Sequence, residues 1–220
     1  MIKKFNITPD WISGFTQSDG SRLRLVINFT NIKHGIPIRP TPVFNLTQSN
    51  LESELFKEIQ KYLGIGKVYK NRKNVTFVVR SIDEIVNVLL PLFDRRSLHP
   101  LRESKLESYN KFKAVVLMIK DKKHLTLEGI IQILNLSYFM NKDTSLRTEE
   151  TKKILVDSIR IKYGELPEVV TPEIVLPSLS NSNLNSMNLE FVRGLIDGDG
   201  SFNVSFATKR RRITVNFTVV

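Results

Sequence analysis

The chain carries the same short pattern twice, once near each end. Residues 12–20 read ISGFTQSDG, and residues 192–200 read VRGLIDGDG. Thr8 and Asn188 are suitable N-cap residues, so each copy is expected to be a helix that ends at Asp-Gly. A strand-like alternation of apolar and polar residues follows each copy directly. The chain therefore contains an internal repeat, and each unit begins with a helix that leads into a strand.

Each copy also has small residues four positions apart. They are Gly14 and Ser18 in the first copy, and Gly194 and Gly198 in the second. Residues four apart lie on one face of a helix, and small side chains let two helix backbones approach closely. We therefore expect the two helices to pack against each other through these residues.

An aspartate stands at the end of each expected helix. Asp19 and Asp199 would each face the negative end of a helix dipole, and pairing the helices would add repulsion between the two carboxylates. A divalent cation held by both carboxylates and by phosphate oxygens would reverse both effects, which indicates metal-assisted phosphodiester hydrolysis. The alternative is that each Asp-Gly is an ordinary turn.

Composition limits the partner and the kind of metal site. There are 33 Lys and Arg against 22 Asp and Glu, a net charge of +11, which favours a polyanionic partner such as nucleic acid or an acidic membrane surface. The absence of cysteine and the presence of only three histidines leave oxygen ligands for any metal. No apolar run has membrane-spanning length, so an integral membrane protein is not expected.

The sequence between the copies predicts further elements. Ser49 with Glu52, and Ser81 with Glu84, fit capping boxes before two helices. Other helices are expected at 105–120, 126–140 and 147–163, and strands at 21–30, within 66–81, and within 201–220. The Pro-, Ser- and Asn-containing stretch 164–188 is typical of a linker, so we predict a first unit at 1–163 and a second unit at 189–220.

Basic residues accompany the expected strands. Residues 21–30 alternate apolar and polar side chains, which predicts a half-buried strand with a basic outer face. Cationic turns at Lys70–Lys73 and Lys209–Arg212 are suited to phosphate contact. The candidate nucleic-acid-binding residues are Arg22, Arg24, Asn28, Lys70, Arg72, Lys73, Lys209, Arg210, Arg211 and Arg212.

The two repeated segments resemble the signature helices of the LAGLIDADG homing endonuclease family. The stretches ESELFKEIQKYLGIGKVYKNRKN and LRESKLESYNKFKAVVLMIKDKKHLTLEGI between them also resemble that family, so the resemblance covers nearly the whole chain. It implies an α+β fold in which each αββαββα repeat contributes an antiparallel, saddle-shaped sheet that lies in the DNA major groove. It further implies cleavage of both strands with Mg²⁺, or another divalent cation, at the helix ends.

The resemblance also implies roles for individual residues. Asp19 and Asp199 match the metal-binding acids, with the backbone carbonyls of Ser18 and Gly198 as helpers. Gln48 matches a polar residue that orders water, and Lys105 matches the basic residue beside the scissile phosphate. A helix-leading loop residue is the alternative for Gln48, and a solvated helix lysine is the alternative for Lys105. One departure is Gln17, which stands where the family usually has an acid and where the second copy has Asp197.

The predicted function is that of an intron-encoded, site-specific endonuclease of double-stranded DNA. The alternatives are an intron RNA maturase and a decayed, non-cleaving DNA-binding remnant, which Gln17 and the incomplete second repeat would favour. A complete two-repeat chain is expected to be a monomer, whereas a truncated chain has a bare motif helix for self-association. Richness in Asn, Ile, Lys and Leu resembles products of AT-rich organelle genomes and predicts a mitochondrial location.

Overall fold

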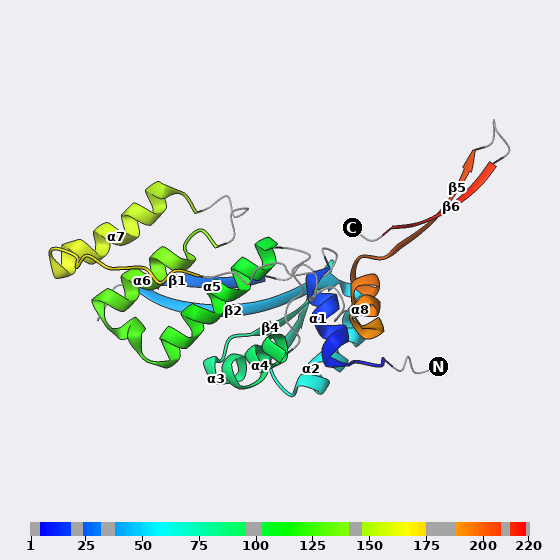
Figure 1. Cartoon of the computed structure of the whole chain (residues 1–220), viewed down its shortest axis with the longest axis horizontal. Helices are drawn as coiled ribbons and strands as arrows, with labels where there is room; N and C mark the ends of the chain where they lie inside the picture. The colour runs from blue at the N-terminus through cyan, green and yellow to red at the C-terminus, as the bar shows by residue number, and fades with distance from the viewer. Residues whose placement is uncertain are drawn as a thin grey trace.

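The two repeated segments form helices α1 (Pro9–Gln17) and α8 (Leu189–Asp199), which lie side by side although they come from opposite ends of the chain (Figure 1). The computed structural model describes residues 5–18, 24–31, 38–95, 103–140, 147–174, 188–207 and 212–218. The fold is α+β with antiparallel sheets, as predicted.

A four-stranded antiparallel sheet follows α1, with the strand order β1-β2-β4-β3. Its strands are β1 (Arg24–Asn31), β2 (Ile38–Ser49), β3 (Lys67–Lys70) and β4 (Asn74–Val79). Directly opposed residues of antiparallel strands point to the same face of a sheet, so the pairs Phe44↔Val79 and Leu46↔Phe77 share one face. These side chains are buried, which makes this the inner face of the sheet.

Helices cover the inner face. They are α2 (Ser53–Leu63), the continuous run of α3 (Ile82–Glu84), η2 (Ile85–Leu89) and α4 (Leu90–Arg95), then α5 (Glu103–Lys120) and α6 (Leu127–Ser137). The short turns η1 (Asn50–Glu52) and η3 (Lys123–Leu125) precede α2 and α6. Phe15 of α1 packs edge-on against Phe56 of α2, so α1 belongs to the same core.

The αββαββα repeat implies a second strand, but the residues alone did not predict β2, which contains two prolines. Pro40 pairs with Phe29 and Pro42 with Ile27 of β1, whereas β4 pairs with β2 only from Phe44 onward. The first half of β2 is therefore paired on one side only. Proline is tolerated in a strand that is paired on one side, where its nitrogen can face the side without a partner strand.

The remaining elements lie at the ends of the molecule (Figure 1). Helix α7 (Glu149–Tyr163) begins at a capping box made by Thr148 and Thr151. Strands β5 (Ser201–Ala207) and β6 (Arg212–Thr218) form a two-stranded ribbon that projects away beyond α8. Within the described ranges no helix is long and apolar enough to cross a membrane.

Candidate active site and nucleic-acid interface

Helices α1 and α8 touch through their glycines. A methyl group on Gly14 would stand 2.0 Å from the carbonyl oxygen of Phe191, and one on Gly194 would stand 2.1 Å from that of Trp11. Both distances are far below an ordinary contact, so the two backbones meet directly. Each glycine meets the residue three positions before the other glycine, and the contact therefore has approximate twofold symmetry.

The same symmetry appears where the two helices begin. The Thr8 side chain caps α1 by accepting from the Trp11 N–H, and its hydroxyl donates to Glu190 in the first turn of α8 at 3.2 Å. The Asn188 side chain caps α8, and its amide donates to Asp10 in the first turn of α1 at 2.6 Å. These crossed cap contacts tie the start of each helix to the other helix.

The two copies differ two residues before the aspartate of each Asp-Gly, where the first has Gln17 and the second has Asp197. Asp197 accepts a hydrogen bond from the indole Nε1 of Trp11 at 2.7 Å, so this carboxylate serves the helix contact. Its counterpart Gln17 is buried, with 3% of its surface exposed. A neutral amide suits that position, because an ionised carboxylate there would lose its hydration beside the negative end of α1.

The packing brings the C-terminal ends of the helices together. A methyl group on Gly198 would stand 1.9 Å from the hydroxyl oxygen of Ser18, the C-cap residue of α1. Asp199 is the last residue of α8 and is partly exposed beside this contact. All four predicted packing residues, Gly14, Ser18, Gly194 and Gly198, thus lie between the helices. Asp19 lies outside the described residues.

Lys105 reaches the same place from a distant part of the chain. It lies near the start of α5 and is partly buried, and its amine donates to the carbonyl oxygens of Gln17 at 2.6 Å and Ser18 at 3.0 Å. These are among the last carbonyls of α1, which have no partner within the helix. The amine is therefore bound to the end of α1 and is not a solvated helix lysine.

Gln48 has a local contact. It lies near the end of β2, and its side-chain oxygen accepts the backbone N–H of Ser49 at 3.0 Å. That bond favours the predicted alternative of a polar residue leading into a helix. The hydrogen bonds of the described residues do not join Gln48 to the ends of α1 and α8.

The outer face of the sheet carries polar and basic side chains. Asn28 of β1 is exposed there, and Thr47 and Thr76 are hydrogen bonded across β2 and β4 at 3.1 Å. Arg72 and Lys73 are exposed in the β3–β4 turn, where the Asn71 side chain accepts from two backbone N–H groups.

Lys70 was predicted in a cationic turn suited to phosphate contact, but it is the last residue of β3 and lies on the other face of the sheet. Its strand partner is Val75, a buried residue of the inner face, and its amine donates to Ser53 of α2 at 3.1 Å. A one-residue shift along a strand changes the face on which a side chain lies, so Lys70 and Tyr69 point to opposite sides.

Other predicted basic residues are placed only in part. Arg24 begins β1 and Arg212 begins β6, but their side chains are not described. Arg22, Lys209, Arg210 and Arg211 lie outside the described residues.

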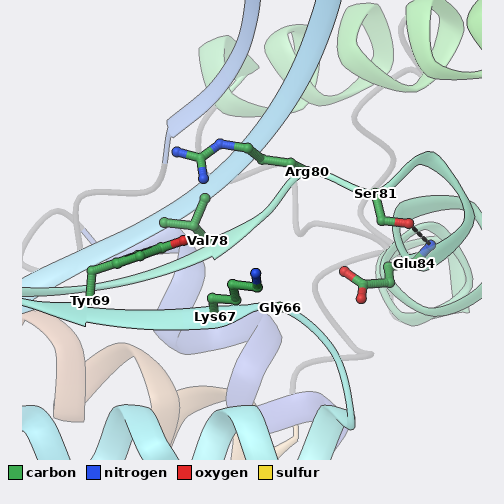
Figure 2. Close-up of a pocket in the computed structure, with 7 residues that line it drawn as sticks. All are labelled: Gly66, Lys67, Tyr69, Val78, Arg80, Ser81 and Glu84. Atoms are coloured by element: carbon green, nitrogen blue, oxygen red, sulfur yellow. Dashed lines mark hydrogen bonds between the residues drawn. The ribbon is translucent and has the colours of Figure 1, made fainter.

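A pocket of about 270 Å³ opens on the outer face, at the end of β4. Figure 2 shows Lys67, Tyr69 and Arg80 around it, with Glu84 at the start of the next helix on the other side. Lys67 and Tyr69 pair with Val78 and Thr76, so they belong to the outer face, and Arg80 is exposed. These three residues were not among the sequence candidates. Strand alternation in GKVYK and VVR could have indicated them.

The paired helix ends offer oxygen ligands for a cation. The described donors are the Asp199 carboxylate and the backbone carbonyls of Ser18 and Gly198, a set of the hard kind that Mg²⁺ and Ca²⁺ prefer. Within the described ranges no group of three or more acidic or histidine side chains could hold a metal, so backbone and external oxygens would have to complete the shell. The Lys105 amine on the Ser18 carbonyl shows that positive charge fits this place.

Comparison with known proteins gives consistent matches. The sequence pattern of a family described as LAGLIDADG endonuclease matches residues 12–116. A protein of Mycosarcoma maydis named "Probable intron-encoded DNA endonuclease 1" is 45% identical over 217 residues, which are 98% of this chain and 75% of that protein.

Two solved structures share the fold. The LAGLIDADG meganuclease I-CpaMI bound to uncleaved DNA is 25% identical, with a TM-score of 0.67 over 96% of this chain and 66% of that one. I-SmaMI, bound to an uncleaved DNA target in the presence of calcium ions, is 20% identical with a TM-score of 0.70, over 96% of this chain and 66% of that chain. The chain thus spans about two thirds of the length of these structures.

Proposed function

Because this chain belongs to the LAGLIDADG endonuclease family, we propose that it is part of an intron-encoded, site-specific endonuclease that hydrolyses double-stranded DNA. One observation carries the proposal. The ends of α1 and α8 meet: Gly198, the neighbour of Asp199 in sequence, lies against Ser18, and the Ser18 carbonyl accepts a hydrogen bond from the Lys105 amine.

Each group has a role in phosphodiester hydrolysis under this proposal. The Asp199 carboxylate, with Asp19 as its counterpart from the first repeat, holds the divalent cation together with the carbonyls of Ser18 and Gly198. That cation, proposed to be Mg²⁺, supplies Lewis-acid activation of the phosphate and of a water when it is bound. The Lys105 amine stands beside the helix ends, where its positive charge stabilises charge that develops on the phosphate oxygens.

The outer face of the sheet is the proposed DNA interface. Basic side chains at its turns would bind phosphates, and polar side chains along the strands would contact base edges in the major groove. The pocket residues Lys67, Tyr69 and Arg80 extend this interface toward the end of β4. Lys70 is excluded from it, because its amine lies on the inner face.

The alternative of an RNA-binding maturase has less support. The relative from Mycosarcoma maydis is named as a DNA endonuclease, and both solved structures described above contain a DNA target. The Mycosarcoma maydis relative is also named as intron-encoded, which supports an intron origin for this chain. We propose a mitochondrial location from the composition, and a division into a first repeat at 1–163, a connection at 164–188 and a second repeat from 189 onward.

The test compares two aspartates on one helix. Asp199→Asn removes a charge at the proposed cation site, and should abolish or strongly reduce Mg²⁺-dependent cleavage without loss of metal-free stability. Asp197→Asn is the matched control, because it makes the same change two residues away and retains an acceptor for Trp11. This control should cleave like the parent.

Cleavage is measured on a plasmid library of randomised duplex inserts, by sequencing the cut ends, and thermal melting is measured on the same preparations. The proteins carry both complete repeats. Equal cleavage by Asp199→Asn and the parent would refute the proposed site. A loss in both variants would assign the effect to helix packing instead of to metal binding.

A further inference from the structure

Lys105 makes a contact within the protein that binding a substrate phosphate does not require. Its amine spans two successive carbonyls, those of Gln17 and Ser18, at the end of a helix that lies far away in sequence. The last carbonyls of a helix lack intrahelical partners and carry the negative end of its dipole. A cation that bridges them is therefore a C-terminal cap of α1, supplied by α5.

The cap coincides with the proposed metal site. The Ser18 carbonyl is a proposed cation ligand, and in this structure it accepts the Lys105 amine at 3.0 Å. An ammonium group and a divalent cation repel each other, and both favour the same oxygen. A bound divalent cation should therefore weaken the bond from the Lys105 amine to this carbonyl, and the amine should weaken binding of the cation.

We propose that Lys105 is a stand-in cation, which holds the end of α1 in the metal-free protein and is displaced from the Ser18 carbonyl when a divalent cation binds. This inference rests on the proposed function, because that function supplies the cation. Displacement frees an ammonium group beside the helix ends, so that cation loading and presentation of the lysine to the phosphate are one event. Lys105 is in this sense a positioning residue as well as a proposed contact of the substrate.

Two measurements on the same variants test the inference. Lys105→Met removes the charge and keeps an unbranched stem. Without metal, in chelator, its melting temperature should fall by roughly 3 to 8 °C, because charge-assisted hydrogen bonds to the end of α1 are lost. Lys111→Met is the matched control on the same helix, and it removes a partly exposed lysine paired with Glu107. It should lower the melting temperature by less than about 2 °C.

The second measurement is the stabilisation produced by Ca²⁺. A ligand that binds only the folded state raises the melting temperature according to its affinity. Lys105→Met removes the competitor, so its Ca²⁺ titration should show an apparent affinity at least about threefold tighter than that of the parent and of Lys111→Met. Lys105→Arg keeps the charge and should remain close to the parent in both measurements. If Lys105→Met does not fold, Lys105→Gln enters the same titrations.

Each outcome decides the inference. An unchanged metal-free melting temperature in Lys105→Met would show that the lysine is not a cap. A lower melting temperature with an unchanged or weaker response to Ca²⁺ would show a cap that does not compete with the cation. Cleavage activity is scored separately. If the parent cleaves DNA with Mg²⁺ but the Lys105 variants do not show the expected shifts, the proposed function stands and the role of Lys105 is refuted. If the variants show these shifts but the parent does not cleave, the role of Lys105 stands and the proposed function is refuted.

Discussion

Substitutions of Ser18 and Gly198, the two small residues where the ends of α1 and α8 meet, should reveal how closely these helices pack. Gly198→Ala would place a methyl group 1.9 Å from the hydroxyl oxygen and 2.5 Å from the Cβ of Ser18. Beyond these two atoms, the nearest one is the Phe15 carbonyl oxygen at 3.4 Å, which is an ordinary contact. The clash of Gly198→Ala is therefore with one side chain, and Ser18→Gly should relieve it.

The magnitudes follow from this geometry. Gly198→Ala alone should lower the free energy of unfolding by about 1 to 3 kcal/mol through overpacking, less about 0.5 to 1 kcal/mol from better helix propensity. Ser18→Gly alone loses a 2.7 Å bond from its hydroxyl to the Phe15 carbonyl, together with backbone order, about 1 to 2 kcal/mol in all. In the double variant the clash is absent, so the two changes should show a favourable coupling of about 1 to 3 kcal/mol.

Gly194→Ala is the contrasting variant. Its methyl group would meet only backbone, at 2.1 Å from the Trp11 carbonyl oxygen and 2.8 Å from the Phe15 nitrogen. Backbone atoms of a packed helix cannot move aside alone, so α1 and α8 would have to separate. Ser18→Gly should not rescue this variant.

The assay is urea unfolding in chelator, followed by tryptophan fluorescence. Trp11 is the single tryptophan of the chain, is 3% exposed and is hydrogen bonded to Asp197, so its emission reports on the helix contact. A coupling within about 0.5 kcal/mol of zero for Ser18→Gly and Gly198→Ala would refute the reasoning. The reasoning would also be refuted if Ser18→Gly restored the stability of Gly194→Ala as well as that of Gly198→Ala, or if Gly194→Ala were as stable as the parent.

Three further outcomes are expected. Asp197→Ala removes the acceptor of the Trp11 indole and should lower the free energy of unfolding by about 1 to 2 kcal/mol with a red shift of the emission, whereas an unchanged spectrum would contradict the bond. Arg80→Ala should weaken DNA binding and reduce the log–log salt slope by about 0.9 if Arg80 neutralises one phosphate, as measured by anisotropy of a labelled duplex. Lys70→Ala, on the inner face, should leave that slope unchanged, and equal effects of the two variants would argue against the outer face as the interface.

The sequence predicted the helix pair well, because its determinants are local. Caps at Thr8 and Asn188, and small residues four apart, are visible in a short window, and they define both where the helices begin and which faces meet. The resemblance pointed to Lys105, but the residues alone could not connect it with Ser18. That contact depends on how α5 crosses the sheet, which a window of sequence does not contain.

The sequence was less informative about which face of the sheet a basic side chain occupies, because a shift of one residue along a strand reverses the face. Lys70 belongs to a basic stretch and is exposed, yet its strand position places its side chain on the face of the sheet that α2 covers, and only the pairing with Val75 reveals this. Arg80 was missed for the opposite reason. It continues the outer face of β4, but it is a single basic residue before the N-cap Ser81 and not part of a basic stretch. The αββαββα repeat implied a strand at β2, but the residues alone did not predict it. Proline argues against strands, and the one-sided pairing around Pro40 and Pro42 is a property of the whole sheet.

The crossed contacts of Thr8 and Asn188 have a consequence for recombination between related proteins. Each of the two hydrogen bonds at the start of the helix pair joins the N-cap residue of one repeat to an acidic residue of the other. A repeat transplanted into a different partner would carry its own cap and its own acid, but would meet a foreign cap and a foreign acid. Chimeras should therefore assemble best when both residues of each crossed pair are transferred together. The residues that decide whether two repeats are compatible then lie at the N-terminal ends of the helices, opposite to the proposed metal site.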